Sequence, residues 1–283
     1  MAKVLVKELE SQKENVDKNK IKQDKPKLTF LKIVQYFVLY SFIGLILETI
    51  FGLLVEGVVE SRKNFLYGPF SCIYGVGGVL MLLTLSRFSK NRYTVFLGGA
   101  VVGTVLEYCI SLFGELIYGV KWWDYSNLPF NINGRVCLIF SLMWGLLGVY
   151  FVSYFQPKVD KFLNMINKKF LDITTVIMVI FLILNFIVTS FALQVFYTRI
   201  SNEHDLQFKD SSQILTEYDK WYANDTFRYI VDTFFSNEKM VETFPNLRIM
   251  LEDGTLIYTR DLYPDIQPYY FKVFDITIKD SNK

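Results

Sequence analysis

Five long apolar runs constrain this chain more than any other feature of its sequence. They cover about residues 33–54, 69–86, 94–118, 136–155 and 173–197, and the second is the shortest. A helix needs about 20 apolar residues to cross a bilayer. Because 52% of the residues are hydrophobic and 20% are charged, the composition indicates a membrane part with polar segments attached. We therefore predict an all-α polytopic membrane protein with about five transmembrane helices.

Lysine and arginine are distributed unevenly around these runs. Residues 1–32 contain nine lysines, and the segments 87–93 and 156–172 contain three and four basic residues. The alternate connections hold only Arg62, Lys63, Lys121 and Arg135. The positive-inside rule then places the N-terminus in the cytoplasm of a bacterial cell, with the first run retained as a membrane anchor. After five crossings, the C-terminus is expected outside the cytoplasmic membrane.

This topology divides the chain into five parts. They are a cytoplasmic Lys-rich tail (1–32), a four-helix membrane core (33–155), a cytoplasmic amphipathic loop (156–172), a fifth transmembrane helix (173–197) and an extracytoplasmic C-terminal region (198–283). The loop is expected to lie on the membrane surface or to bind a cytosolic partner. In the C-terminal region, Asp253-Gly254 between two alternating runs predicts a β-hairpin. We expect a small α+β unit there, either independent or packed on the bundle.

Two acidic residues lie inside apolar runs with the same local pattern. Glu48 in "FIGLILETIF" and Glu107 in "VVGTVLEYCI" each follow a glycine by four residues. Small residues share the helix face of each acid, at positions Ser41, Gly44 and Gly52, and at Gly99, Gly103 and Ser111, before Glu115. A charged residue facing lipid costs at least ~2.5 kcal/mol, so both acids are predicted to face protein. They form a functional pathway site, or they are neutralised by Arg62, Arg135 or a hydroxyl and only fix helix packing.

The two acids also suggest an internal repeat. Each Gly-x-x-x-Glu helix is followed by an outer loop and a glycine-containing helix start, "NFLYGPFSCIYGVGG" and "NINGRVCLIFSLMWGLLG". Two such units enter the membrane from the same side, which indicates a two-helix parallel repeat. Glu48 and Glu107 would then face each other across a pseudo-twofold axis, with Glu115 near the outer mouth.

The outer loops carry aromatic and polar residues that have two interpretations. Trp122, Trp123 and Tyr125 are either interfacial belt residues or, with Asp124, a pocket for an organic cation. Arg62, Asn64, Tyr67 and Arg135 complete this candidate outer-mouth binding set. On the last run, Asn185 and Thr189 are expected to make interhelical hydrogen bonds.

Several site classes are not indicated by the sequence. Cys72, Cys109 and Cys137 lie in apolar runs without metal-ligand spacing, and His204 is the single histidine. We therefore expect no metal, no cofactor and no nucleic-acid partner. A phosphate-binding Gly-x-x-x-x-Gly-Lys-[Ser/Thr] loop is absent, so ATP hydrolysis would need a separate subunit. We also expect no catalytic residues and no enzymatic activity.

Several segments together resemble the CmpB-like permeases, a bacterial membrane family of ABC-transporter type IV. They are "YSFIGLILETIF", "NFLYGPFSCIYGVGG", "GTVLEY", "WWDYSNLPFNINGRVCL" and "MWGLLG", within residues 36–150, with "TFPNLRI" further on. Arg62-Lys63-Asn64 departs from the family's usual Asn-Arg-Gly, and Cys72 replaces a proline. The resemblance implies a multi-spanning permease-like protein but no particular substrate.

Three functions follow as competing hypotheses. The first is a transport component, with Glu48 and Glu107 lining a pathway among membrane lipids and a cytosolic ATPase subunit or a second copy of the chain as partner. The second is a non-transporting anchor or regulatory protein whose C-terminal region binds an envelope partner. The third is an intramembrane enzyme that uses two carboxylates for acid–base chemistry. The sequence contains no recognisable catalytic arrangement of His, Ser or Cys to support it.

Overall fold

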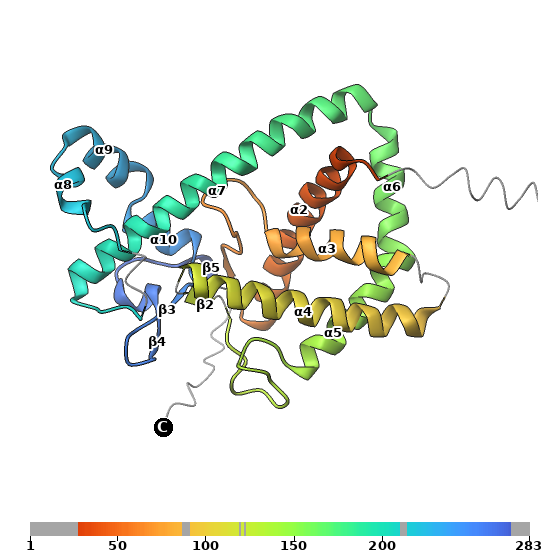
Figure 1. Cartoon of the computed structure of the whole chain (residues 1–283), viewed down its shortest axis with the longest axis horizontal. Coiled ribbons are helices and arrows are strands. Elements are labelled where there is room, and N and C mark those ends of the chain that lie inside the picture. Colours follow the sequence, from red (N-terminus) through yellow and green to blue (C-terminus); the bar gives the residue numbers. More distant parts are fainter. Residues whose placement is uncertain (1–27, 87–90, 119, 122, 210–213, 273–283) are drawn as a thin grey trace, which may run out of the picture.

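The computed structural model describes residues 28–86, 91–118, 120–121, 123–209 and 214–272 (Figure 1). The predicted Lys-rich tail therefore lies almost wholly outside the described residues. The main helices are α2 (Phe30–Val55), α3 (Cys72–Leu85), α4 (Arg92–Tyr118), α5 (Leu138–Tyr150), the π-helical turn η2 (Phe151–Phe155), α6 (Gln156–Met165) and α7 (Lys168–His204). The C-terminal region adds α8 (Tyr218–Tyr222), α9 (Asp225–Phe234), α10 (Asn237–Thr243) and the 3-10 turn η4 (Thr259–Leu262). The short strands are β1 (Val58–Glu60), β2 (Val120–Lys121), β3 (Arg248–Met250), β4 (Leu256–Tyr258) and β5 (Tyr269–Lys272).

Within these described ranges, four helical stretches are long and apolar enough to cross a membrane. They are Phe30–Val55, Arg92–Leu116, Leu138–Met165 and Lys168–His204. The run predicted at 69–86 contains α3, which has 14 residues. At 1.5 Å per residue α3 is roughly 21 Å long, shorter than the ~30 Å hydrocarbon core. Four of the five expected spans thus fall in helical stretches of sufficient length, and the fourth reaches that length only by joining α5, the π-helical turn and α6. The second expected span is a short helix.

The position of α3 along α2 explains its length. The two helices run antiparallel, because Tyr74 lies against Gly44 while Gly78, further along α3, lies against Tyr40. The Ser71 amide donates to the Ser41 carbonyl oxygen at 3.0 Å, so α3 begins beside the middle of α2. Beside the C-terminal half of α2, the chain that leads to α3 is not helical. We call residues 61–71 the first loop; Figure 1 shows it in orange, passing close to α7.

The helices α4 and α5 form a second antiparallel pair. Gly103 lies against Trp144, and Gly99 lies against Gly145 and Gly148. Side chains larger than hydrogen at these positions would separate the helices, so the small residues of the sequence pattern do permit close packing. Since α5 begins near the middle of α4, residues 123–137 cover the rest of α4 as a second loop.

One end of the bundle, where α2 and α4 begin, is covered by α6. We call it the basal end. Val159 and Leu163 of α6 pack against Tyr36, Leu85 and Val95. Tyr36 donates a hydrogen bond to Asp160, and Tyr40 donates one to Gln156. Figure 1 shows the chain changing direction between α5 and α6, at the π-helical turn. Within the predicted amphipathic loop, residues 156–165 thus form a helix that packs one face on the bundle and exposes the other, and residues 168–172 belong to α7.

The C-terminal region lies at the opposite, distal end of the bundle (Figure 1). Its strand β5 pairs antiparallel with β1, which follows α2, and β3 pairs with β2, which follows α4. The last turns of α7 form part of its core, because the side chains from Ala192 to Ile200 are almost all buried. The strands β3 and β4 form the hairpin predicted from Asp253-Gly254, with Gly254 at a φ of 85°.

Candidate functional site

Glu48 sits where the first loop meets α2. The Ser71 hydroxyl donates to Glu48 Oε2 at 3.1 Å, and the guanidinium of Arg62 interacts electrostatically with the same carboxyl group. The side chain of Arg62 lies over Gly52, one turn after Glu48, where a Cβ atom would come within 2.6 Å of it. Gly52 therefore leaves room for the Arg62 guanidinium one helical turn from Glu48. The same guanidinium pairs with Glu56 and, at 3.0 Å, with Glu60.

Glu107 sits at the equivalent point on α4, beside the second loop. The Tyr125 hydroxyl lies 3.5 Å from Glu107 Oε1 as a donor, and the indole of Trp144 acts on the same carboxyl group. Glu107 is only 6% exposed, and its Oε2 atom has no hydrogen-bond partner in the described part of the chain. Tyr125, predicted at the outer mouth, thus turns into the bundle, where its ring stacks on Phe140 at 4.6 Å.

The two acids share one electrostatic neighbour, Tyr74 of α3. Its ring covers Gly44, one turn before Glu48, and its phenol interacts electrostatically with both Glu48 and Glu107. In the second helix pair, Trp144 covers Gly103, one turn before Glu107, in the same way. The sequence pattern did not identify Tyr74 or Trp144. The glycine of each Gly-x-x-x-Glu pattern indicates that a neighbouring side chain packs on that helix face, but it does not identify that side chain.

The remaining outer-mouth residues make separate contacts. Glu115 pairs with Arg135 and lies 3.9 Å from the Lys209 ammonium group. The Trp123 indole donates to the Arg135 carbonyl oxygen at 2.9 Å. Asp124 accepts hydrogen bonds from the amide and hydroxyl of Ser126 and lies 4.0 Å from Arg248. Asp124 is therefore satisfied within the protein, and Trp122 lies outside the described residues.

The first loop is held by α7 through its backbone. The Asn185 side chain accepts from the Tyr67 amide at 3.3 Å and donates to the Tyr67 carbonyl oxygen at 2.5 Å. The Thr189 hydroxyl accepts from the Leu66 amide at 2.9 Å. The two residues expected to join helices thus bind a loop instead. Non-helical backbone at membrane depth needs such partners, because lipid offers no hydrogen bonds.

Asn64 makes a contact within the first loop, and Tyr67 makes one to the C-terminal region. The Asn64 amide donates to the Phe70 carbonyl oxygen at 3.1 Å, which closes the loop before α3. The Lys239 ammonium group lies 4.8 Å from the centre of the Tyr67 ring. Burial lowers the pKa of Lys63, and the charge of neighbouring Lys239 lowers it further.

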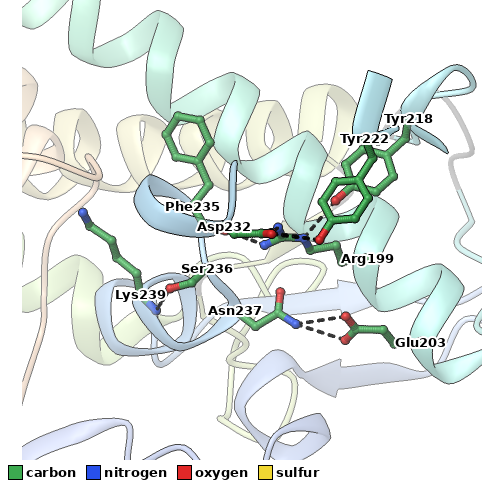
Figure 2. A network of polar contacts seen from close by, with 9 residues as sticks. All are labelled: Arg199, Glu203, Tyr218, Tyr222, Asp232, Phe235, Ser236, Asn237 and Lys239. Atoms are coloured by element: carbon green, nitrogen blue, oxygen red, sulfur yellow. Dashed lines mark hydrogen bonds and ion pairs between the residues drawn. The ribbon is translucent and has the colours of Figure 1, made fainter. Parts of the chain in front are cut away.

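The C-terminal region is joined to the loops and to α7 by buried polar groups. Asn246 donates to Glu60 Oε1, and Arg260 lies 4.0 Å from Glu60 Oε2. Figure 2 shows the second junction, where Arg199 of α7 donates to Tyr218, to the Phe235 carbonyl oxygen and to Asp232. The distal region is therefore anchored both to the segment next to Glu48 and to the end of α7.

Comparison with known protein families identifies the family of this chain. Residues 35–190 match the family described as "Putative ABC-transporter type IV" (ABC_trans_CmpB), a match that covers more than half of the 283 residues. The chain belongs to this family. The resemblance seen in the sequence is thus confirmed, and with its four long apolar helices the chain is a multi-pass membrane protein of a transport-related family. No curated protein and no solved structure matches it.

The CmpB-family match has informative limits. It begins at Gln35 in α2 and ends at Ser190 in α7, so it includes Glu48, Glu107, both loops and α6. It stops before α7 enters the core of the C-terminal region. The candidate carboxylate site therefore belongs to the part of the chain that defines the family.

Proposed function

We propose that this chain is a permease-like subunit of a transport system, with Glu48 and Glu107 as a paired carboxylate site and no enzymatic activity of its own. The observation that carries this proposal is that each acid accepts a hydrogen bond from its neighbouring loop inside the bundle, Glu48 from Ser71 and Glu107 from Tyr125. Polar groups at such positions are usually retained for a pathway or binding site. Each acid lies where a non-helical loop enters the bundle, an arrangement that many transporters use at their substrate sites.

We also propose that the paired site arises from a two-unit repeat, α2–first loop–α3 and α4–second loop–α5. The supporting contacts are alike in both units, since an aromatic side chain of the second helix covers the glycine that precedes the acid. Gly68 and Gly134, one in each loop, both have positive φ angles, of 80° and 67°. In the membrane, the basal end would face the cytoplasm and the C-terminal region the outside, in keeping with the basic residues of α6.

Thiol labelling tests whether the paired site is open to water. In a chain whose three native cysteines are replaced, single cysteines are placed at Glu48 and Glu107, and at Val95 and Leu97 as controls. Val95 is 2% exposed in the core, and Leu97 is 64% exposed on the apolar surface of α4. A charged, membrane-impermeant methanethiosulfonate should modify the first two positions in spheroplasts or inverted vesicles and leave both controls unmodified. Absence of labelling at both acids from either side would reject the pathway.

The family name leads us to propose a separate nucleotide-hydrolysing partner at α6. This helix exposes Lys158, Lys161 and Phe162 while its other face packs on the bundle. We expect a subunit with a phosphate-binding loop to co-purify with the intact chain and to be lost from the Lys158→Glu/Lys161→Glu variant. Lys220→Glu/Arg228→Glu, at two exposed positions of the C-terminal region, is the charge-matched control. If no such subunit accompanies the unmodified chain, the ABC-type assignment is wrong.

A second candidate function is an anchor for an envelope partner. Its supporting observation is a group of exposed aromatic side chains on α8 and α9, namely Trp221, Tyr229 and Phe234. Under this hypothesis, replacing the three by serine abolishes the cellular phenotype, whereas Glu48→Gln and Glu107→Gln have no effect. The opposite pattern supports the transport proposal.

A further inference from the structure

The two acids of the paired site are not equivalent. Glu48 has the Arg62 cation beside it and a hydrogen bond from Ser71. The described groups that act on Glu107 are Tyr125 and Trp144, and neither carries a positive charge. Taking a carboxylate out of water is costly unless an opposite charge accompanies it. Among the described residues, no cation therefore acts on Glu107, whereas Glu48 shares the Arg62 guanidinium with Glu56 and Glu60.

Two buried side-chain oxygen atoms, on residues one turn apart on α4, also lack hydrogen-bond partners. Neither Glu107 Oε2 nor Ser111 Oγ has a hydrogen-bond partner in the described part of the chain, and Ser111 is 2% exposed. Residues four apart on a helix lie one above the other, with Cβ atoms about 5–6 Å apart. Buried polar atoms without a hydrogen-bond partner in a native protein indicate a bound ligand, an ion or an ordered water.

We propose that Glu107 and Ser111 bind a small monovalent metal cation, an inference that rests on the proposed transport function and assigns a ligand to one half of its carboxylate site. The ligands fit this class, because alkali cations are hard ions that bind carboxylate and hydroxyl oxygens. One carboxylate balances one positive charge, whereas a divalent ion would leave a net charge in the bundle. Arg62 acts on Glu48 while it pairs with Glu56 and Glu60, whereas no described cation acts on Glu107, so we place the metal cation in the Glu107 half of the paired site.

Carbodiimide protection tests this site in the purified full-length protein. Dicyclohexylcarbodiimide modifies protonated carboxyl groups in apolar surroundings, so a bound metal cation should protect Glu107. With NaCl replaced by choline chloride at constant ionic strength, we expect labelling of Glu107, followed by mass spectrometry, to rise at least tenfold. Labelling of Glu48 should not change with the salt. Equal labelling of Glu107 in Na⁺, Li⁺, K⁺ and choline would show that the carboxyl group takes a proton only.

Direct binding provides the second measurement. Equilibrium dialysis with ²²Na⁺ should find about one ion per chain, and Glu107→Gln should abolish it. Ser111→Ala should weaken the apparent Na⁺ affinity at least tenfold while Glu107 remains reactive to the carbodiimide in choline. Ser41→Ala is the matched control, because Ser41 Oγ is also buried without a hydrogen-bond partner but lies on α2 against Gly75. Absence of ²²Na⁺ binding to the unmodified chain would overturn the proposal.

The two proposals fail in different experiments. A chain that binds Na⁺ but whose acids resist the thiol reagent has a cation site without a pathway. A chain whose acids are modified by the thiol reagent but that binds no alkali cation keeps the pathway and loses the metal ion.

Discussion

Replacing Asn185 by leucine should release the first loop from α7. The substitution leaves the amide and the carbonyl group of Tyr67 without their partners, which lie 3.3 and 2.5 Å away. Each buried backbone group that loses its hydrogen bond costs about 1–3 kcal/mol. Because water reaches part of the opened loop, we take the lower limit, about 2 kcal/mol for the two groups. A change of 1.4 kcal/mol alters an equilibrium tenfold, so the open population should rise about 30-fold.

Limited trypsin digestion measures this opening, since Arg62 and Lys63 lie within the loop. When the loop recloses faster than it is cut, the cleavage rate follows the open population. We expect cleavage after Lys63 to accelerate about 30-fold in Asn185→Leu. Thr174→Val is the control on the same helix, because its hydroxyl bonds only to the carbonyl oxygens of Phe170 and Leu171. A rate within twofold of the control would refute our account of how the loop is held.

Three further predictions concern other junctions. Gly103→Ala places a Cβ atom 2.2 Å from the Trp144 ring, so it should lower the stability by about 1–3 kcal/mol. Its Tm should fall more than that of Gly77→Ala, whose added Cβ atom has its nearest contact at 3.2 Å. Arg199→Met removes the side chain that donates to Tyr218, Asp232 and the Phe235 carbonyl oxygen, and it should lower the free energy of unfolding by about 2–3 kcal/mol. Tryptophan fluorescence in urea measures this loss, and an unchanged unfolding midpoint would contradict it. Burial and a hydrogen bond to Glu203 raise the pKa of Tyr263. The stability from this contact should therefore be intact below pH ~10 and fall above it, whereas Tyr263→Phe should show no such loss in thermal unfolding from pH 9 to 12.

The sequence determined the properties that depend on local composition and spacing. Hydropathy identified the apolar helices, because a span must be apolar over its whole length. The four-residue spacing of Gly44 and Glu48, and of Gly103 and Glu107, identified the packed helix faces, since helical periodicity is fixed by the backbone. The same segments indicated the CmpB family, which the family match confirms.

Only the tertiary structure decided which groups meet. Asn185 lies 118 residues from Tyr67, and no local pattern states that its side chain will bind loop backbone rather than a helix. The shortness of α3 follows from where the first loop enters the bundle, which hydropathy does not show because a buried loop can be as apolar as a helix. That Arg62 acts on Glu48, while no cation of the described residues acts on Glu107, likewise depends on the path of each loop. Hydrogen bonds and charge balance are set by distances in space, and these depend on how segments far apart in the chain pack together.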